Sequence, residues 1–449
     1  MSLLPALQAW LGRAAANTLR REGSVVVAVT GSVGKSTTKQ AIGAMLQADA
    51  PERRVRVPEA SYNNELGVPL TVFGHAAPGR NARAWIALLA DAWLTSVGLK
   101  KTGITTFVLE MGADKPGDLG YLASIAPPDV AVVTAITSND DTLAPVHLGN
   151  YGSLDELVAE KSTLVKALKP GGDAVLNADD KKVFAMRHLT QEHVLTFGEA
   201  DGSDVRIASA RITVEDGPHG KVPTGLDVTL ENYHRSYRAF LPGVYGTSVA
   251  YAYAAATAVA EALDVPAEQI SEFAAHFKPV RGRTRILPGI KHTTLLDDTY
   301  NASPASVLQS LKDLAALPLN PGQRKIACLG EMRELGEKAE AMHRRVGAEA
   351  AKLGIDVLVC CGIFGRAMAE GATANGLPAE HMYIVADTPE AGRLLQDLIR
   401  PGDVVLAKAS QGTLETKGVR MERVIKELMA EPMRAGELLV RQDPAWQRK

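Results

Sequence analysis

A glycine-rich segment close to the N-terminus has the residue types of a phosphate-binding loop. It reads Thr-Gly-Ser-Val-Gly-Lys-Ser-Thr over residues 30–37 and separates a β-rich run, residues 25–30, from a helical stretch, residues 35–46. Glycines let backbone N–H groups curl around phosphate oxygens, and a helix N-terminus adds partial positive charge. A plain glycine-rich turn is the alternative, but strand, loop and helix all stand where phosphate binding needs them.

The loop suggests roles for particular side chains. Lys35 would contact the β- and γ-phosphates of ATP, and the Ser36 hydroxyl would bind Mg²⁺. Glu110 ends another β-rich run, residues 105–110, and ligand sites of open α/β sheets gather at such strand ends. A carboxylate is a hard oxygen ligand that suits Mg²⁺; a surface carboxylate at a strand end is the competing interpretation. The candidate nucleotide-binding residues of the loop are Thr30, Gly31, Ser32, Val33, Gly34, Lys35, Ser36 and Thr37.

The elements that must position these residues alternate between strand and helix over residues 24–176. This alternation predicts a mostly parallel sheet with helices on both faces. Strand-like runs then follow one another without helices up to residue 241, which predicts a small antiparallel part, and a second alternating region begins after residue 282. We therefore expect an α/β protein in which a mostly parallel P-loop domain precedes a smaller Rossmann-like domain. The expected parts are an amphipathic helix at 1–23, an ATP-binding domain at 24–282, a second α/β domain at 283–430 and a polar tail at 431–449.

Composition narrows the class of protein. A length of 449 residues suggests two or three domains. The formal net charge of −2 gives no bulk attraction to nucleic acid, so we expect no nucleic-acid partner. The three cysteines, Cys328, Cys360 and Cys361, resemble neither a disulfide framework nor a zinc site. We expect a monomer that acts on small molecules in the reducing environment of the cytoplasm.

Two apolar stretches have no assigned chemistry. Residues 1–22 place apolar side chains at helical spacing and arginines after them, which is the wrong order for a signal peptide. Residues 82–99 are apolar except for Arg83 and Asp91. Neither stretch makes a convincing membrane span. Each could rest on a membrane surface or a protein partner, and the competing interpretation is a helix packed on its own domain.

The phosphate loop is a shortened variant, since Val29 stands where the usual pattern has its first glycine. This variant resembles the loop of the Mur ligases, and other segments resemble motifs of the same family. They are an Asn-Asn-x-x-Gly-x-Pro segment at 63–69, a glutamate strand at 109–113, an Asn-x-Asp-Asp turn at 177–180, a domain start at 297–304 and a histidine–lysine pair at 147 and 161. Residues 330–336, followed by His343, resemble the branch that adds D-alanyl-D-alanine to the UDP-N-acetylmuramoyl tripeptide.

The resemblance implies an ATP-dependent ligase of peptidoglycan precursor synthesis that forms an amide bond through an acyl phosphate, with two Mg²⁺ ions. It implies catalytic roles for Lys35, Glu110, His147 and Lys161. The implied metal ligands are Ser36, Glu110, His147 and Lys161, the last after carbamylation. Implied contacts to ATP come from Asn177, Arg283, Tyr300 and Asn301, and implied contacts to the substrates come from Asn63, Asn64, Lys408 and Ser410.

The sequence also departs from the family pattern. Only about 23 residues precede the first predicted strand, so we expect the family's N-terminal UDP-binding domain to be absent. Tyr245 and Gly246 stand where the family has His-Asn, and residues 408–411 read Lys-Ala-Ser-Gln where relatives often have Lys-Gly-Ser-Arg. Three functions remain open: the D-alanyl-D-alanine-adding ligase, an amide ligase for a carboxylate without UDP, and a nucleotide-binding partner protein that no longer ligates. The intact set of Lys35, Glu110, His147 and Lys161 argues against the third.

Overall fold

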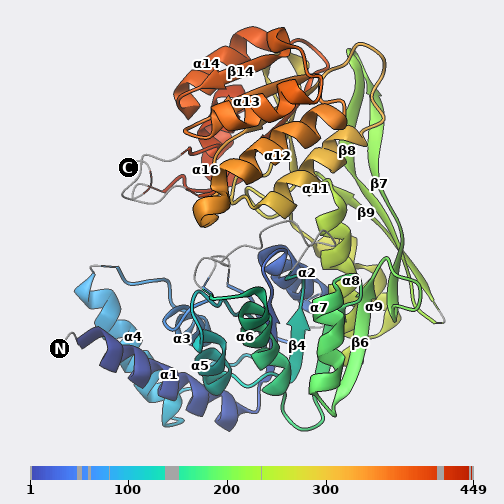
Figure 1. Cartoon of the computed structure of the whole chain (residues 1–449). Coiled ribbons are helices and arrows are strands. Elements are labelled where there is room, and N and C mark those ends of the chain that lie inside the picture. Colours follow the sequence, from blue (N-terminus) through green and yellow to red (C-terminus); the bar gives the residue numbers. More distant parts are fainter. Residues whose placement is uncertain are drawn as a thin grey trace.

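The computed structural model describes residues 3–47, 53–58, 62–79, 81–136, 151–233, 235–411, 419–443 and 446. Two α/β parts follow each other along the chain, and each is built on its own sheet (Figure 1).

The first sheet has nine strands within the described residues, in the order β2-β3-β1-β4-β5-β6-β7-β8-β9. Strands β2 to β7 pair in parallel, and β7, β8 and β9 form an antiparallel extension. The strands are β1 (Val25–Thr30), β2 (Val55–Arg56), β3 (Thr106–Glu110), β4 (Val130–Val133), β5 (Asp173–Asn177), β6 (His193–Gly198), β7 (Val205–Gly217), β8 (Gly220–Glu231) and β9 (Ser236–Pro242).

Helices cover both faces of this sheet because its central strands are apolar on both faces. In β1, Val27 and Val29 pack with α2 (Lys35–Gln47) and α8 (Thr247–Ala262). Val26 and Ala28 point to the opposite layer, which explains the continuous apolar run of this strand. The other helices of this part are α1 (Leu3–Glu22), α3 (Gly67–Phe73), α4 (Ala82–Ser96), α5 (Asp118–Ile125), α6 (Leu154–Lys166), α7 (Lys181–Phe184), η2 (Ala185–Leu189), α9 (Ala267–Ser271) and α10 (Phe273–His276).

The second sheet has the order β10-β11-β15-β12-β13-β14, with β10 antiparallel to β11 and the remaining pairs parallel. Its strands are β10 (Arg285–Pro288), β11 (Thr294–Asp297), β12 (Lys325–Leu329), β13 (Val357–Cys361), β14 (Met382–Val385) and β15 (Val404–Lys408). Its helices are α11 (Pro304–Ala315), α12 (Ala339–Lys352), α13 (Gly365–Ala374), α14 (Thr388–Leu398), α15 (Glu422–Leu428) and α16 (Ala435–Leu438), with short 3-10 turns η3 (Ile290–His292), η4 (Gly336–Lys338), η5 (Ala379–His381) and η6 (Pro432–Arg434).

Hydrogen bonds to the backbone join the two parts at the crossover and at the β7–β8 hairpin. Where the chain crosses over, the Tyr245 N–H donates to the Thr284 carbonyl at 3.0 Å. At the tip of the β7–β8 hairpin, the Gln323 side chain accepts from the Lys221 N–H at 2.7 Å and donates to the Lys221 carbonyl at 2.9 Å. Figure 1 shows this hairpin running up beside the second part. The hairpin therefore braces the two parts at a distance from the crossover.

The predicted fold class is confirmed, because a mostly parallel sheet with an antiparallel extension is followed by a second α/β sheet. Ser153 caps the start of α6: its hydroxyl accepts from the Glu156 N–H at 3.1 Å, and the Glu156 carboxylate accepts from the Gly152 N–H at 2.8 Å. All three cysteines are free thiols in buried positions. No helix in the described ranges is long and apolar enough to cross a bilayer.

Candidate active site

The predicted phosphate loop lies at the carboxyl end of β1, directly before α2. The backbone of Gly31 has a φ of +144°, and a Cβ there would lie 2.1 Å from the Thr134 hydroxyl oxygen, so this position accepts only glycine. The Lys35 ammonium donates to the Gly31 carbonyl at 2.8 Å. Burial lowers the pKa of Lys35, and the charge of Glu110 partly opposes this shift.

Glu110 comes from the end of β3, which pairs directly with β1. Its Oε2 accepts a hydrogen bond from the Ser36 hydroxyl at 3.0 Å and lies 3.5 Å from the Lys39 ammonium. The Glu110 side chain is buried, and burial alone would raise its pKa, but the charges of Lys39, Lys35 and Arg283 together bring the pKa below its ordinary value. Glu110 is therefore a buried anion surrounded by cations.

The donor set around Glu110 fits a magnesium ion. Ser36 and Glu110 offer a hydroxyl and a carboxylate oxygen 3.0 Å apart, and Mg²⁺ is usually held by one or two such ligands together with substrate phosphates and water. Within the described ranges, no three His, Cys, Asp or Glu side chains cluster as a complete metal cage.

Lys161 is completely buried on α6. Its ammonium has no hydrogen-bond partner among the described residues. Burial, with repulsion from Lys35 as the next cause, lowers its pKa to about 7. Lys161 is therefore not a solvated lysine on the helix surface. His147, its predicted partner, lies outside the described residues.

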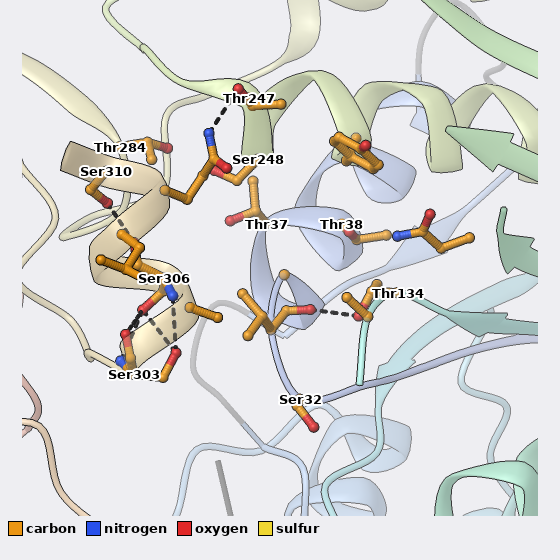
Figure 2. Close-up of a pocket in the computed structure, with 18 of the residues that line it drawn as sticks. Ser32, Thr37, Thr38, Thr134, Thr247, Ser248, Thr284, Ser303, Ser306 and Ser310 are labelled. Atoms are coloured by element: carbon orange, nitrogen blue, oxygen red, sulfur yellow. Dashed lines mark hydrogen bonds between the residues drawn. The ribbon is translucent and has the colours of Figure 1, made fainter. Parts of the chain in front are cut away.

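A cavity of about 640 Å³ lies between the two parts. Figure 2 shows hydroxyl side chains around it, including Thr37 and Thr38 from α2 and Ser306 and Ser310 from α11. Asn177 lines it from the end of β5. The Asn177 amide oxygen accepts the Asp179 N–H at 2.9 Å, which leaves the amide NH₂ group as the donor that Asn177 can offer a ligand.

A second cavity of about 220 Å³ adjoins the first and shares Arg283 and Lys408 with it. The predicted residues that line this second cavity are Ser32, Val33, Gly34, Lys35, Ser36, Asn63, Glu110, Arg283, Tyr300, Asn301 and Lys408. These residues are spread over more than 370 positions of the chain, so only the meeting of the two parts assembles them.

Arg283 reaches from the second part into the first. Its guanidinium stacks over the Tyr300 ring at 4.3 Å, and one of its terminal nitrogens lies 3.5 Å from the Ser36 hydroxyl. Its Nε is buried without a hydrogen-bond partner among the described residues. A guanidinium held flat by a ring, with donors still available, suits a phosphate or carboxylate.

Lys408 lies at the end of β15 and is buried. It forms an ion pair with Asp298 and donates to the Asn301 carbonyl at 3.1 Å. Asp298 also accepts from the Ser310 hydroxyl at 2.8 Å. The Lys408 side chain therefore lines both cavities with its charge already partly balanced.

Other predicted residues have their polar groups engaged inside the protein. The Ser410 hydroxyl donates to the Ala302 carbonyl at 2.7 Å and accepts from the Arg333 N–H at 3.0 Å. The Asn64 side chain accepts from the Gly67 N–H at 2.9 Å at the start of α3. The structure does not bring Ser410, Asn64 or Thr30 to the wall of either cavity.

Two models of known families match this chain. The Mur ligase middle domain matches residues 92–259, and the Mur ligase glutamate ligase domain matches residues 282–411. The UDP-N-acetylmuramoyl-tripeptide–D-alanyl-D-alanine ligase of Mycobacterium tuberculosis is 34% identical over 418 residues, which cover 89% of this chain and 73% of that relative. The chain belongs to the Mur ligase family. The relative of the same name from Bacillus subtilis is 26% identical over 415 residues, which cover 92% of this chain and 78% of that relative.

Solved Mur ligase structures share the fold over both parts. MurF from Acinetobacter baumannii has a TM-score of 0.71 at 24% identity and covers 94% of this chain and 80% of its own. MurF from Thermotoga maritima, solved in complex with ADP, has a TM-score of 0.70 at 24% identity. The match covers 94% of this chain and 83% of the MurF chain. The resemblance inferred from the sequence motifs is thereby confirmed at the level of family and fold.

Gly246, which stands with Tyr245 where the family has His-Asn, lies at the start of α8 in a conformation that favours glycine. Gly246 has a φ of +88°, and a Cβ there would lie 2.5 Å from a carboxylate oxygen of Asp313. That carboxylate, from α11, accepts from the Thr247 N–H at 3.3 Å and the Thr247 hydroxyl at 3.0 Å. The first turn of α8 is thus capped from the other part of the chain, which the sequence did not predict.

Two further residues take roles that the sequence interpretation missed. Lys39 is one helical turn after Lys35, and this i, i+4 spacing was the available signal that it shares the face toward Glu110. His343, used as a mark of the family branch, is buried; its Nε2 accepts the Met332 N–H at 2.9 Å, and its Nδ1 pairs with the Ala339 carbonyl. Both ring nitrogens of His343 therefore bond to the backbone and hold the loop after β12 in place.

Proposed function

We propose that this Mur ligase joins a carboxylate to an amine while ATP is converted to ADP and phosphate, and that its substrates are a UDP-N-acetylmuramoyl tripeptide and D-alanyl-D-alanine. The small cavity carries the proposal, because Lys35 and Glu110 of the first part face Arg283 and Lys408 of the second. The choice of substrates is supported by the name of the relative from Mycobacterium tuberculosis at 34% identity.

The proposed reaction has two steps. A carboxylate oxygen of the tripeptide attacks the γ-phosphorus of ATP, a new P–O bond forms, and ADP leaves with the electron pair of the broken P–O bond. The amine of the dipeptide then attacks the acyl carbon, phosphate leaves, and the amine loses a proton to solvent. Both partners of the first step are anions, so catalysis depends on positioning and on neutralising charge.

The chain supplies cations on both sides of the reacting groups. Lys35 lies on the phosphate loop, and its hydrogen bond to the Gly31 carbonyl keeps its ammonium over that loop. Arg283 approaches from the opposite side, with donors aimed at the Ser36 hydroxyl. Movement of the two parts toward each other would bring these cations onto the transferred phosphoryl group.

Magnesium would be held first by Ser36 and Glu110. When bound, Mg²⁺ would neutralise charge on the phosphates and orient them. The second proposed metal site uses His147 and Lys161. The fit of Lys161 rests on its buried and unpartnered amine: a neutral amine adds to carbon dioxide, a C–N bond forms, one proton leaves, and the resulting carbamate is an anion able to bind a metal. Burial favours the neutral amine that this reaction needs.

Phosphate release from ATP tests the proposal, measured with the UDP-N-acetylmuramoyl tripeptide in the presence and absence of D-alanyl-D-alanine. Turnover that requires both substrates supports the proposed function. Turnover with a muramoyl tripeptide that lacks UDP, and none with the nucleotide sugar, would establish the alternative amide ligase. Nucleotide binding without turnover on either acid would indicate a partner protein.

Two variants test the metal assignment within the same assay. Lys161→Ala should lose turnover and regain part of it when short carboxylic acids are added, because they can replace the carbamate. Lys166→Ala, which changes an exposed lysine on the same helix, is the matched control and should keep full activity. Full activity of Lys161→Ala would rule out the carbamate.

A further inference from the structure

We propose that the outer face of α4 docks on an anionic lipid bilayer. We call this surface the α4 face and define it by Ile86, Ala90, Trp93, Val97 and Leu99. Residues 86, 90, 93 and 97 are spaced by four, three and four positions, so they lie along one side of the helix. The proposal is independent of the ligase function.

The apolar side chains of the α4 face are exposed as a group. The exposed fractions are 66% for Ile86, 52% for Trp93, 45% for Val97 and 71% for Leu99. Large exposed apolar side chains are otherwise scattered over the described part of the chain, in η2, β8, β9, β14, η6 and single loop positions. Single exposed apolar residues are ordinary, whereas a contiguous patch marks an interaction site.

Packing against the domain core accounts for the apolar residues on the inner side of α4 but not for those of the α4 face. Leu88, Ala92 and Thr95 are buried, and Leu88 and Ala92 join the core cluster that includes Leu11 and Leu19 of α1. A surface helix with one buried stripe ordinarily carries polar residues opposite. Because α4 is apolar on both sides, its outer stripe is suited to a second, external apolar partner.

Basic side chains outnumber acidic ones on α4, on the residues that follow it and on α1, which packs beside it. The segments 3–22 and 82–101 contain six basic side chains and two acidic ones, although the whole chain has a net charge of −2. Both acidic side chains are engaged internally: Asp91 pairs with His75 and Lys100, and Glu22 accepts from the Thr102 N–H at 2.8 Å. The basic residues are Arg13, Arg20, Arg21, Arg83, Lys100 and Lys101, and all are exposed.

Several of these cations are placed at one end of α4. The Arg21 guanidinium of α1 donates to the Ser96 carbonyl at 3.0 Å, at the last residue of α4. Lys100 and Lys101 directly follow Leu99. Figure 1 shows α1 and α4 side by side at the end of the first part that is remote from β6 to β9, so a flat surface could approach them.

This chemistry fits a bilayer better than a second copy of the chain. An apolar stripe with a tryptophan, bordered by lysines and arginines, is the pattern of a helix that lies in the interface of an anionic membrane. A two-fold contact between two α4 faces would bring like charges together, which is repulsive. The lipid headgroups supply the negative charge that this surface lacks.

Co-sedimentation of the full chain with vesicles tests the proposal. Vesicles of phosphatidylcholine alone are compared with vesicles that contain roughly one third phosphatidylglycerol, at low and high salt. Binding should require the anionic lipid and weaken with salt, since each basic residue near such a surface contributes roughly a fivefold gain in affinity. Trp93 emission should shift to shorter wavelength on binding, and Trp93→Phe should remove that change.

Three variants separate the contributions. Ile86→Ser combined with Trp93→Ser should weaken vesicle binding by roughly tenfold or more, because apolar area is lost from the contact. Arg83→Gln combined with Lys101→Gln should weaken it roughly 25-fold at low salt and have little effect at high salt. Ile363→Ser, at a residue of the second part that is 79% exposed, is the matched control and should bind as the wild type does.

ATP binding by each variant checks that it is folded. The proposal is overturned if the wild-type chain does not sediment with anionic vesicles at low salt, or if the serine variant sediments equally well. It is also overturned if the chain forms a concentration-dependent dimer in gel filtration that the serine variant abolishes, because a second copy then covers the α4 face.

Discussion

Replacing Lys161 with methionine should stabilise the chain while abolishing its turnover. The Lys161 amine is buried in α6 without a hydrogen-bond partner among the described residues, and burial, followed by repulsion from Lys35, lowers its pKa from 10.5 to about 7. Between these two values the unfolded chain binds more protons than the folded chain. The free energy of unfolding therefore rises with pH across this window, and the cost of burying Lys161 is greatest at its lower end.

The cost can be worked out from the two pKa values. Keeping Lys161 in the fold costs about 4 kcal/mol at pH 7.5 and about 1.5 kcal/mol at pH 9.5. Methionine has a similar length and no charge, so Lys161→Met should raise the free energy of unfolding by up to these amounts. The pH dependence distinguishes this effect from a simple gain in packing, which would be the same at both pH values.

Urea denaturation in buffer free of carbon dioxide, at both pH values, measures the effect. Lys166→Met is the control on the exposed side of the same helix and should change the free energy of unfolding by less than about 0.5 kcal/mol. Added bicarbonate should stabilise the wild type but not Lys161→Met, because a carbamate forms only on the folded chain's neutral amine. A stability difference that does not change with pH would refute the argument that the fold keeps Lys161 neutral.

Three other changes test contacts around the cleft. Lys39→Met leaves Glu110 without its nearest buried cation, so the free energy of unfolding should fall by about 3 kcal/mol. Thermal denaturation measures this loss, and added magnesium with ATP should restore part of it. A melting temperature equal to that of the wild type would contradict the prediction. Gly246→Ala should cost about 2 kcal/mol or more in urea denaturation because of its positive φ and its closeness to Asp313, whereas Gly436→Ala, where a Cβ meets nothing within 4 Å, should be nearly neutral. Burial raises the pKa of Asp313 from 3.8 to about 6, so its charge destabilises the fold as pH rises through that window. Asp313→Asn should gain up to about 3 kcal/mol at pH 7 and only about 0.5 kcal/mol at pH 4. An equal gain at both pH values would show that charge is not the cause.

Local patterns in the sequence were sufficient to predict the strand and helix that flank the glycine-rich loop. β1 has the predicted bounds, Val25–Thr30, because five consecutive apolar residues followed by glycines leave few alternatives for a central parallel strand. The apolar stretch at 82–99 was left with two interpretations, since periodicity alone does not say which side of a helix meets the core. Its buried stripe at Leu88 and Ala92 and its exposed stripe at Ile86 and Trp93 are visible only in the fold.

The candidate site likewise has features that the sequence predicted and features that are visible only in the fold. The sequence by itself predicted the position of the glycine-rich loop after β1 and of Glu110 at the end of β3, because a loop and the end of a strand are set by neighbouring residues. Only the tertiary structure decided that Lys161 is buried without a partner, that Lys39 lies beside Glu110, and that the Ser410 hydroxyl is engaged inside the protein. Burial and long-range pairing depend on which residues distant in the chain are brought together. Helical or strand periodicity does not identify those residues.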